Sequence, residues 1–434
     1  MSDPGDGGPA DAAVADALVR SDDDRAQAST TTFASLGVPN FRRYFVGQTL
    51  SSIGSWFHLL AMSLLVVELT GSGAALGGVV ALQMLPLLLF GTYAGVVLDR
   101  HDPRVVLVIT NAVNAVLGAA LVAVSVTGHI NGWWLGGFSL AFGLVWPFDR
   151  PATQVIPIEL VPPPLVSNAL GLNSMVQSLA RLVGPALAGI TFAVVGPSWC
   201  FAVNVVSFLV ALGFLLALDR SQLHARPRST SGRGQVREGF AYLRRSPQLR
   251  SILLANAIIG LLAVNFMVVV TAMVQIQFGA GGLAVGIAHA ANALGAIVGG
   301  AVAGAVLARL SRHLDLVVLA LGAALAVNAV APSLTVFVLL GPLMGVTFVA
   351  YQSSVLDSCH RLARPEMFGR MVSLVTMGLQ GTTPIGSVII GTVIDVWSPR
   401  VALGLGAGSC LVAGGLLTVA GRRQAAEAII PAVD

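Results

Sequence analysis

Twelve apolar runs of helical length lie between residues 44 and 420, and they constrain the fold more than any other feature of this sequence. A helix of about 20 apolar residues matches the thickness of the hydrocarbon core of a bilayer. We therefore predict an all-α integral membrane protein with twelve transmembrane helices. The runs occupy residues 44–67, 74–98, 105–127, 133–156, 165–195, 199–218, 251–278, 283–308, 316–331, 334–356, 371–394 and 401–420.

The composition excludes several other classes of protein. Only 10% of the residues are charged, whereas a soluble domain has about 25%. All 24 basic residues are arginine, so there is no lysine for a P-loop and an ATP-driven pump is excluded. The cysteines Cys200, Cys359 and Cys410 are far apart and the histidines are scattered, so we expect no metal site. No catalytic motif occurs, and we expect neither an enzyme nor a cofactor.

Arginine placement predicts the orientation in the membrane. If the N-terminus is cytoplasmic, Arg400 is the one arginine in an outer loop, Arg150 and Arg181 lie within apolar runs, and the rest lie on the inside. This asymmetry is the positive-inside pattern, and an even number of helices places both termini in the cytoplasm. The arginines sit at helix ends, so they do not indicate a nucleic-acid partner. We read residues 1–35 as a disordered acidic cytoplasmic tail and residues 422–434 as a second cytoplasmic tail.

The sequence also repeats at an offset of about 200 residues, half the length of the core. Residues 77–104 resemble residues 286–313, with glycine at 95 and 304 and arginine at 100 and 309. We therefore predict two parallel six-helix bundles, residues 36–218 and 251–421, related by a pseudo-twofold axis. Residues 219–250 form a cytoplasmic linker, in which Val236, Phe240 and Leu243 share one face of a short amphipathic helix at the membrane surface. For residues 222–234 a plain solvated linker is an equal alternative.

One short turn carries a resemblance to a known superfamily. It reads Gly95-Val-Val-Leu-Asp99-Arg100-His-Asp-Pro-Arg104 and is similar to the Gly-x-x-x-Asp-Arg…Arg signature of the major facilitator superfamily. The segments 148–162 and 168–189 resemble its transmembrane secretion effector branch, which is similar to enterobactin exporters and macrolide efflux proteins. The second copy of the turn has Ala308 and His313 in place of the acidic and the last basic residue.

The resemblance implies that Asp99 meets the start of the eleventh helix near Gly369 and Arg370 and holds the cytoplasmic side shut. A carboxylate at a helix N-terminus is favoured by the helix dipole. Gly95 permits close approach of helices. Arg100 and Arg104 complete this predicted gate.

Arg181 lies near the middle of the fifth run, where a charge is costly and needs a partner. Asp149 is our candidate, because at 1.5 Å per residue the two positions differ in depth by ~9 Å, a gap that an arginine largely spans. Arg150 or interior water is the competing partner of Asp149. We also name Asp149 as the residue that exchanges a proton, with His58 next.

Two further sets of residues complete the predicted site. The fifth helix resembles the packing signature of drug–proton antiporters, with ordinary tight packing as an equal alternative; its members are Gly171, Gly184, Pro185 and Gly189. Polar side chains within the runs are expected in the substrate cavity; these are His58, Gln177, Asn265, Gln352 and Gln380.

The expected function is secondary active transport. We predict a monomeric, proton-coupled exporter of a small apolar or amphipathic molecule, such as a drug, siderophore or secondary metabolite, that works by alternating access. Its partners are the substrate, protons and membrane lipids, in a bacterial-type inner (plasma) membrane. A lysophospholipid or other lipid flippase is one alternative, and a non-transporting receptor or lipid-binding protein is another.

Overall fold

The structure is a computed structural model that describes residues 32–224, 238, 241–244, 246–302, 313–364 and 367–429. The side chains of residues 92, 99, 302 and 422–429 lie outside this description. Predictions for most of the acidic tail, for residues 225–237, 239, 240 and 245 of the linker, for most of the second copy of the turn and for the Asp99 side chain therefore fall outside the described residues.

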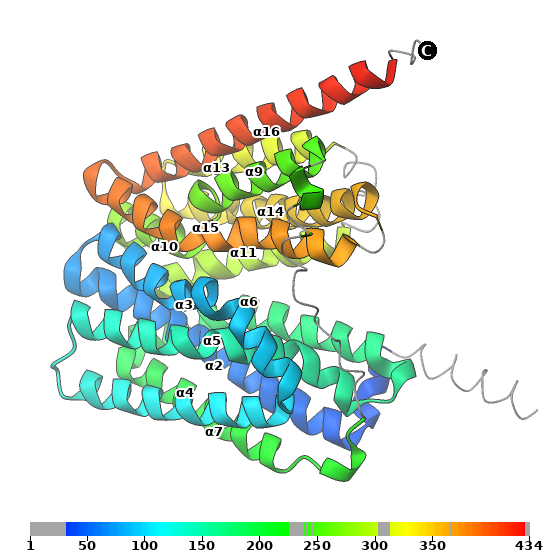
Figure 1. The fold of residues 1–434 in the computed structure, drawn as a ribbon. Helices are drawn as coiled ribbons and strands as arrows, with labels where there is room; N and C mark the ends of the chain where they lie inside the picture. The colour runs from blue at the N-terminus through cyan, green and yellow to red at the C-terminus, as the bar shows by residue number, and fades with distance from the viewer. Residues whose placement is uncertain are drawn as a thin grey trace, which may run out of the picture.

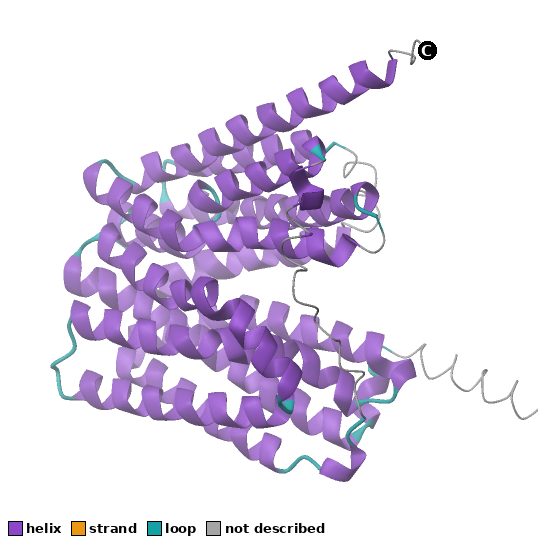
Figure 2. Ribbon diagram, in the orientation of Figure 1, coloured by secondary structure: helices purple, strands orange, loops and turns teal. Residues whose placement is uncertain are grey.

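Helices joined by short turns make up this part of the chain, and no strand occurs in it (Figure 2). The first set of helices is α2 (Pro39–Thr70), α3 (Gly73–Arg100), α4 (Pro103–Val126), α5 (Gly132–Leu160), α6 (Val166–Val195) and α7 (Pro197–Leu216). The second set is α9 (Pro247–Leu262), α10 (Phe266–Ala272), α11 (Gly282–Val302), α13 (Leu314–Ala329), α14 (Leu334–Leu362), α15 (Phe368–Val396) and α16 (Pro399–Ile429). Single turns lie at Ala34–Gly37, Pro163–Leu165, Arg220–Gln222 and Met273–Gln277.

Ten of the described segments are long and apolar enough to cross a membrane. The prediction of an all-α membrane protein is thus confirmed at this level. α5 is not among the ten, and it contains three prolines together with Asp149, Arg150 and Glu159. α13 is apolar but has only 16 residues in the described part of the chain.

Helix boundaries follow local capping chemistry. Ser72 accepts a hydrogen bond from the Ala75 amide and so begins α3, and Asn131 does the same for α5 with the amides of Trp133 and Trp134. These side chains satisfy amide donors that have no partner within the helix. α2, α4, α7 and α9 begin with proline at the first or second position, where the missing N–H costs nothing.

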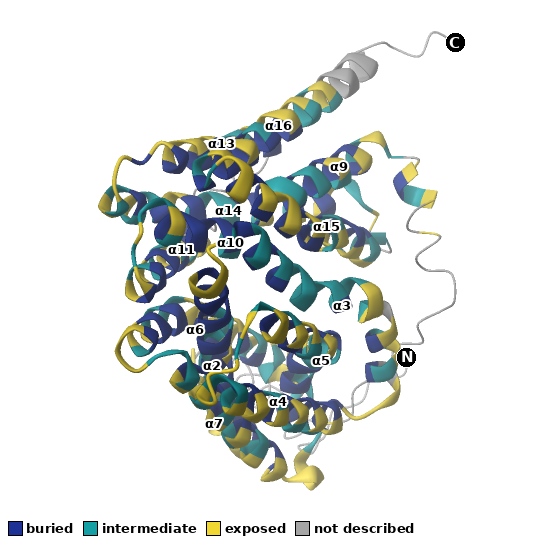
Figure 3. Cartoon of the chain, turned by 90° about the vertical axis from the view of Figure 1, so that its left-hand side faces the viewer, coloured by how far each residue is buried: buried dark blue, intermediate teal, exposed yellow. Residues whose placement is uncertain are grey.

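The helices form two groups that converge at one end of the molecule and diverge at the other (Figure 1). Helices α2–α7 pack on one another, and helices α9–α16 do the same. Between the groups, α3 packs on α15 and α6 packs on α11. We call the end at which α3 begins and α15 ends the converging end, and the opposite end the diverging end. Figure 3 looks onto the converging end, where α3 and α6 lie on the side of the first group that faces the second.

Two backbone-to-backbone crossings join the groups at the converging end. A Cβ atom on Gly77 of α3 would overlap the carbonyl oxygen of Ser387 in α15 and would lie 3.3 Å from Cα of Gly391. A Cβ atom on Gly286 of α11 would overlap the carbonyl oxygen of Pro185 in α6 and would lie 3.2 Å from Cα of Gly189. Only glycine therefore fits at either crossing.

The same crossings match the internal repeat of the sequence. Gly77 and Gly286 occupy corresponding positions of the repeat, and so do Gly189 and Gly391. In the structure Gly77 meets Gly391, and Gly286 meets Gly189. Repeat-related residues thus make related contacts, which supports a pseudo-twofold arrangement of the two groups.

The seventh apolar run differs from its prediction, because it is not one continuous helix. α9 ends at Leu262 and α10 begins at Phe266. The Asn265 amide donates to the carbonyl of Leu261 at 3.0 Å, and the Ser387 hydroxyl donates to the Asn265 oxygen at 3.0 Å. An interrupted helix is tolerated at membrane depth when neighbouring side chains satisfy its polar groups.

Replacing Gly77 by alanine should disturb the crossing, whereas replacing its neighbour Gly78 should not. A Cβ on Gly78 meets no atom within 4 Å. We expect Gly77→Ala to destabilise the protein by about 1–3 kcal/mol through overpacking. Gly78→Ala should be neutral or slightly stabilising, by up to ~1 kcal/mol from helix propensity. Thermal unfolding of both purified variants in detergent tests this, and equal melting temperatures would contradict the crossing.

Candidate functional site

Asp395 links the two groups at the converging end, a role the sequence did not suggest. It lies in the last turn of α15, and its carboxylate accepts from Ser72 Oγ at 2.6 Å, from the Gly73 amide at 2.5 Å and from the Ala74 amide at 3.0 Å. The carboxylate therefore caps the first turn of α3 from the other group. Such a contact combines hydrogen bonds with a favourable helix dipole. We call it the Asp395 latch.

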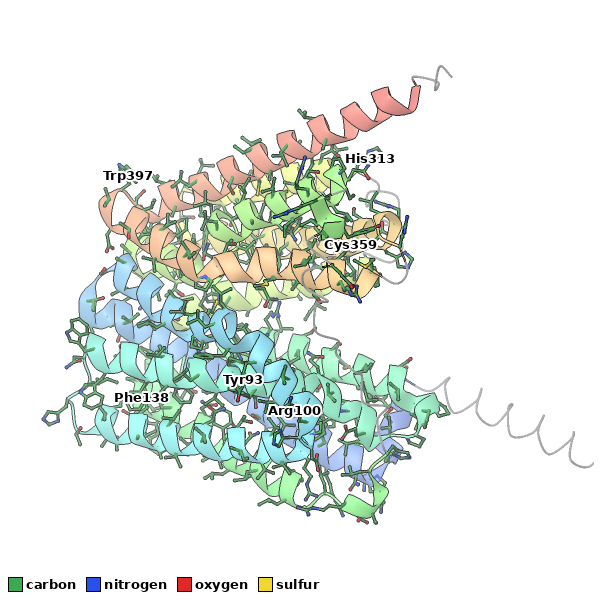
Figure 4. The ribbon with its side chains drawn as sticks, in the orientation of Figure 1. Tyr93, Arg100, Phe138, His313, Cys359 and Trp397 are labelled. Atoms are coloured by element: carbon green, nitrogen blue, oxygen red, sulfur yellow. The ribbon has the colours of Figure 1, made fainter. Side chains whose placement is uncertain are left out.

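The predicted gate turn lies at the other end of α3. Arg100 is exposed in the last turn of α3, and Tyr93 is exposed one to two turns before it (Figure 4). Gly95 lies beyond the crossing, and a Cβ atom there would meet no atom within 4 Å. The expected close helix contact at Gly95 is thus not made in this conformation, because α3 and α15 diverge at this level.

Arg104 acts within the first group rather than across the interface. It is buried, and its guanidinium donates to the carbonyls of Leu215 at 2.9 Å and Leu216 at 3.0 Å. These carbonyls end α7, so Arg104 satisfies acceptors that have no partner within that helix. In this conformation Arg104 therefore caps α7, and its place in the gate stays a prediction.

Arg370 at the start of α15 binds the linker. Its guanidinium lies 2.5 Å from the Glu238 carboxylate, while neighbouring Gly369 is exposed with free space around it. The described linker residues pack on the second group, since Leu243 is buried beside Leu249 and Met371. This part of the linker therefore covers the start of α15, and its place at the membrane surface stays a prediction.

The charged residues of α5 and α6 are arranged differently from the predicted ion pair. Thr110 of α4 donates to the Asp149 carboxylate at 2.8 Å, and the charge that acts on Asp149 is that of its neighbour Arg150. Arg150 stacks on Trp146, with its guanidinium carbon 4.2 Å from the ring centroid. Arg181 acts electrostatically on Arg150. Among the described residues no ion pair joins Asp149 to Arg181, so the competing interpretation, Asp149 with Arg150, fits the structure better.

Arg181 faces the second group. Residues three or four positions apart share a helix face, and stepping from Gly189 to Pro185 leads to Arg181 and then to Ser178 and Ser174. Gly189 and Pro185 contact α11 at the converging end, whereas Arg181, Ser178 and Ser174 are exposed. Because the groups diverge there, this part of the face points into the space between them.

Two of the residues expected in the substrate cavity are buried elsewhere. His58 is 5% exposed, and its ring lies 4.2 Å from that of Phe142 and 5.9 Å from that of Phe201, inside the first group. Both ring nitrogens lack a hydrogen-bond partner. Asn265 is 3% exposed at the break between α9 and α10. Neither residue lies at the surface between the groups, because aromatic packing encloses the first and the helix break holds the second.

The three glutamines differ in position. Gln177 of α6 donates to Ser52 of α2 at 3.2 Å and so joins two helices of the first group. Gln352 and Gln380 are exposed. Gln380 lies on the face of α15 that carries Ser387 and Gly391, so it faces α3 beyond the crossing.

The packing signature of α6 is tight at three of its four positions. A Cβ atom on Gly184 would lie 2.5 Å from Cβ of Trp56, and one on Gly189 would lie 2.6 Å from the carbonyl oxygen of Gly282. Pro185 contributes its carbonyl to the crossing with α11. Gly171 is exposed, with no atom within 4 Å of a Cβ there.

The described part of the chain contains no group of three His, Cys, Asp or Glu side chains that could hold a metal ion.

Comparison with known proteins places this geometry in a family. The family model described as transmembrane secretion effector matches residues 30–432. Macrolide efflux protein A of Streptococcus pyogenes is 23% identical over 362 residues, which cover 82% of this chain and 89% of that protein. Among solved structures, the nucleoside transporter NupG has a TM-score of 0.70 at 12% identity and covers 88% of this chain and 99% of its own. A bacterial homologue of the iron transporter ferroportin, in an inward-facing state, has a TM-score of 0.67 at 15% identity, with 88% and 98% covered.

These findings confirm the resemblance seen in the sequence. The relatives and the structural neighbours named here are transporters rather than enzymes. The chain belongs to the transmembrane secretion effector family of major facilitator transporters, and it is a multi-pass membrane transporter.

Proposed function

We propose that this protein is a proton-coupled exporter of small apolar or amphipathic molecules that works by alternating access. Its twelve spans form two pseudo-twofold bundles, and both termini are cytoplasmic. The observation that carries the proposal is the position of the crossings, because both lie at one end while polar residues occupy the same helix faces toward the other end. With this orientation the converging end is the outer side, and the structure is an inward-open conformation.

We propose that the faces of α3 and α6 that lie apart from the second group at the diverging end come into contact with it in another conformation. Stepping along α3 from Gly77 leads through Ala81, Met84 and Leu88 to Gly95, positions that share the side of the helix that packs on α15. Position 99 is four residues further on, and we propose that it continues this side. On α6 the corresponding face carries Gly171 near the diverging end. Both glycines are open now. We propose that they become close crossing points when the inner side shuts and the outer crossings separate.

Asp99 and Asp395 would then alternate as latches. Each is the penultimate residue of its helix, and α3 and α15 run antiparallel. Asp395 caps the first turn of α3 in the present conformation. By the same geometry Asp99 would cap the first turn of α15, at Gly369 and Arg370, once the inner side closes. Glu238 binds Arg370 while that side is open.

For proton coupling we propose Asp149. Its carboxylate is partly buried at mid-depth between α4 and α5, and the Thr110 hydroxyl and Arg150 act on it. Movement of substrate or of Arg150 would change the cost of keeping this carboxylate ionised, which would couple proton and substrate binding.

The direct test of the function is substrate-screened uptake into inverted membrane vesicles with an imposed pH gradient. We expect uptake of at least one amphipathic compound that collapses when a protonophore removes the gradient. Vesicles containing Asp149→Asn at the same protein level should lose the dependence on the gradient. Equal uptake with and without the gradient in wild-type vesicles would rule out proton coupling.

Gly95→Leu should leave the fold intact but abolish transport. A Cβ atom at this position meets no atom within 4 Å in the present conformation, whereas a leucine side chain would block closure of the inner side. We expect wild-type expression and melting temperature with transport reduced at least about tenfold, which corresponds to ~1.4 kcal/mol. Gly78→Leu on the same helix is the matched control. Normal transport by Gly95→Leu would contradict the closing motion.

The two latches should have opposite effects on the conformational equilibrium. Asp395→Ala removes the cap that holds the outer side shut, which is worth up to ~2 kcal/mol when partly buried, so outward-open molecules should become more abundant. Asp99→Asn should favour the inward-open state and slow transport. Cysteine accessibility on the outer side, measured in intact cells, should rise in the first variant and fall or stay low in the second. A change in the same direction for both would exclude alternation.

A further inference from the structure

The guanidinium groups of Arg150 and Arg181 are two positive charges at membrane depth with little compensation. Both side chains are exposed, Arg181 lies on the face of α6 that points into the space between the groups, and the charge of Arg181 acts on Arg150. Within the described residues, Arg181 has no hydrogen-bond or ion-pair partner, and Arg150 has the ring of Trp146 and the charge of Asp149. The Asp149 carboxylate is held by Thr110 on α4.

The opposing wall supplies no compensating charge. α9 after Arg250, α10, α11, α14 before Asp357, and α15 between Arg370 and Asp395 contain no Asp, Glu, Lys or Arg. The charges at mid-depth are therefore two arginines and one aspartate, a net charge of +1 when all are ionised. An unpaired cation at this depth is expensive, and the present conformation leaves this one without a fixed anion.

A polar strip leads to the arginines from the diverging end. Ser167, Gly171, Ser174 and Ser178 lie on the same face of α6 as Arg181, and all are exposed. Hydroxyl and backbone groups along this face can solvate a polar ligand group as it moves toward mid-depth. By contrast, the exposed part of α15 opposite contributes only neutral residues such as Met377 and Gln380.

We propose that the transported molecule carries an anionic group, a carboxylate or a phosphate, which binds between Arg150 and Arg181. This assignment rests on the proposed transport function and adds the charge of the substrate to it. The planar guanidinium group binds carboxylate and phosphate through paired hydrogen bonds. Stacking on Trp146 fixes the guanidinium of Arg150, so less conformational freedom is lost on binding. A cationic substrate would instead meet repulsion from both arginines.

The test compares matched probes on the full-length protein in phosphatidylcholine nanodiscs. The probes are dansylamino-undecanoic acid, its methyl ester and the corresponding amine, which differ mainly in charge. We expect the acid to bind most tightly, and Arg181→Gln or Arg150→Gln to weaken its binding about tenfold or more. Binding of the ester should change less than about twofold. Arg181→Lys should restore only part of the affinity, because lysine keeps the charge but not the paired geometry.

Arg42→Gln is the matched control, since it removes one exposed arginine at the start of α2, away from this site. Equal binding of the acid and the ester, tighter binding of the amine, or unchanged binding of the acid in both glutamine variants would overturn the proposal. If phosphatidylglycerol in the nanodisc competes with the acid in the wild type but not in the double variant, the anion site stands and a lipid phosphate is its source.

Uptake into inverted vesicles separates this inference from the proposed function. Transport of the ester by both the wild type and Arg181→Gln, without any preference for the acid, would leave the exporter intact and remove the anion site. Absence of uptake for all three probes and for the screened compounds would count against the transporter function itself.

Discussion

The contact between α3 and α15 at the converging end is the constraint on which the rest of this structure depends. Two helices from different halves of the chain approach until the Cα of one meets the backbone of the other, and only glycine at position 77 permits this. The related crossing of α6 and α11 lies at the same end. In the present conformation these two crossings hold the groups together at one end, and the remaining lengths of the four helices separate toward the other end (Figure 1).

The polar residues follow from this arrangement. A cap such as the Asp395 latch is possible only where the start of one helix meets the end of its antiparallel partner, and α3 and α15 meet in this way at the converging end. Charged groups at mid-depth are tolerable only where water can enter or a partner is near. Arg181 lies on a helix face that separates from the other group, and Arg150 is exposed. The latch, Arg181 and the gate residues thus lie at successive depths, from the converging end to the diverging end, along α15, α6 and α3.

Patterns that depend on one helix were readable from the sequence, and contacts between helices mostly were not. Apolar length gave the membrane helices, the glycine repeat indicated the two halves, and the short turn with Asp99 indicated the superfamily. The capping role of Asp395 was not predicted, because an aspartate in the last turn of a helix is common and its partner lies more than 300 positions earlier in the chain. The helix faces of α6 could have shown that Arg181 shares a side with Gly189, since that argument needs only the spacing of residues.

Other predicted site residues are placed differently in this conformation, and the reason is the packing of neighbouring helices. His58 and Asn265 are polar residues within apolar runs, which suggested a cavity, but aromatic rings enclose the first and a break in the seventh run holds the second. Arg104 matches a signature residue, yet it caps α7 within the first group. A residue type and its depth indicate that a partner is needed, whereas the packing of neighbouring helices decides which partner it finds.

If the two ends of the molecule open in alternation, distances between spin labels placed at both ends should change in opposite directions. One pair of labels replaces Val126 and Val330, exposed residues of the two groups at the converging end, and the other replaces His101 and His360 at the diverging end. Pulsed electron–electron double resonance would measure both distances in liposomes across a range of pH and in the Asp395→Ala background. Whenever the distance at the converging end lengthens, the distance at the diverging end should shorten. Two distances that change together, or a second distance that stays fixed while the first changes, would contradict alternating opening.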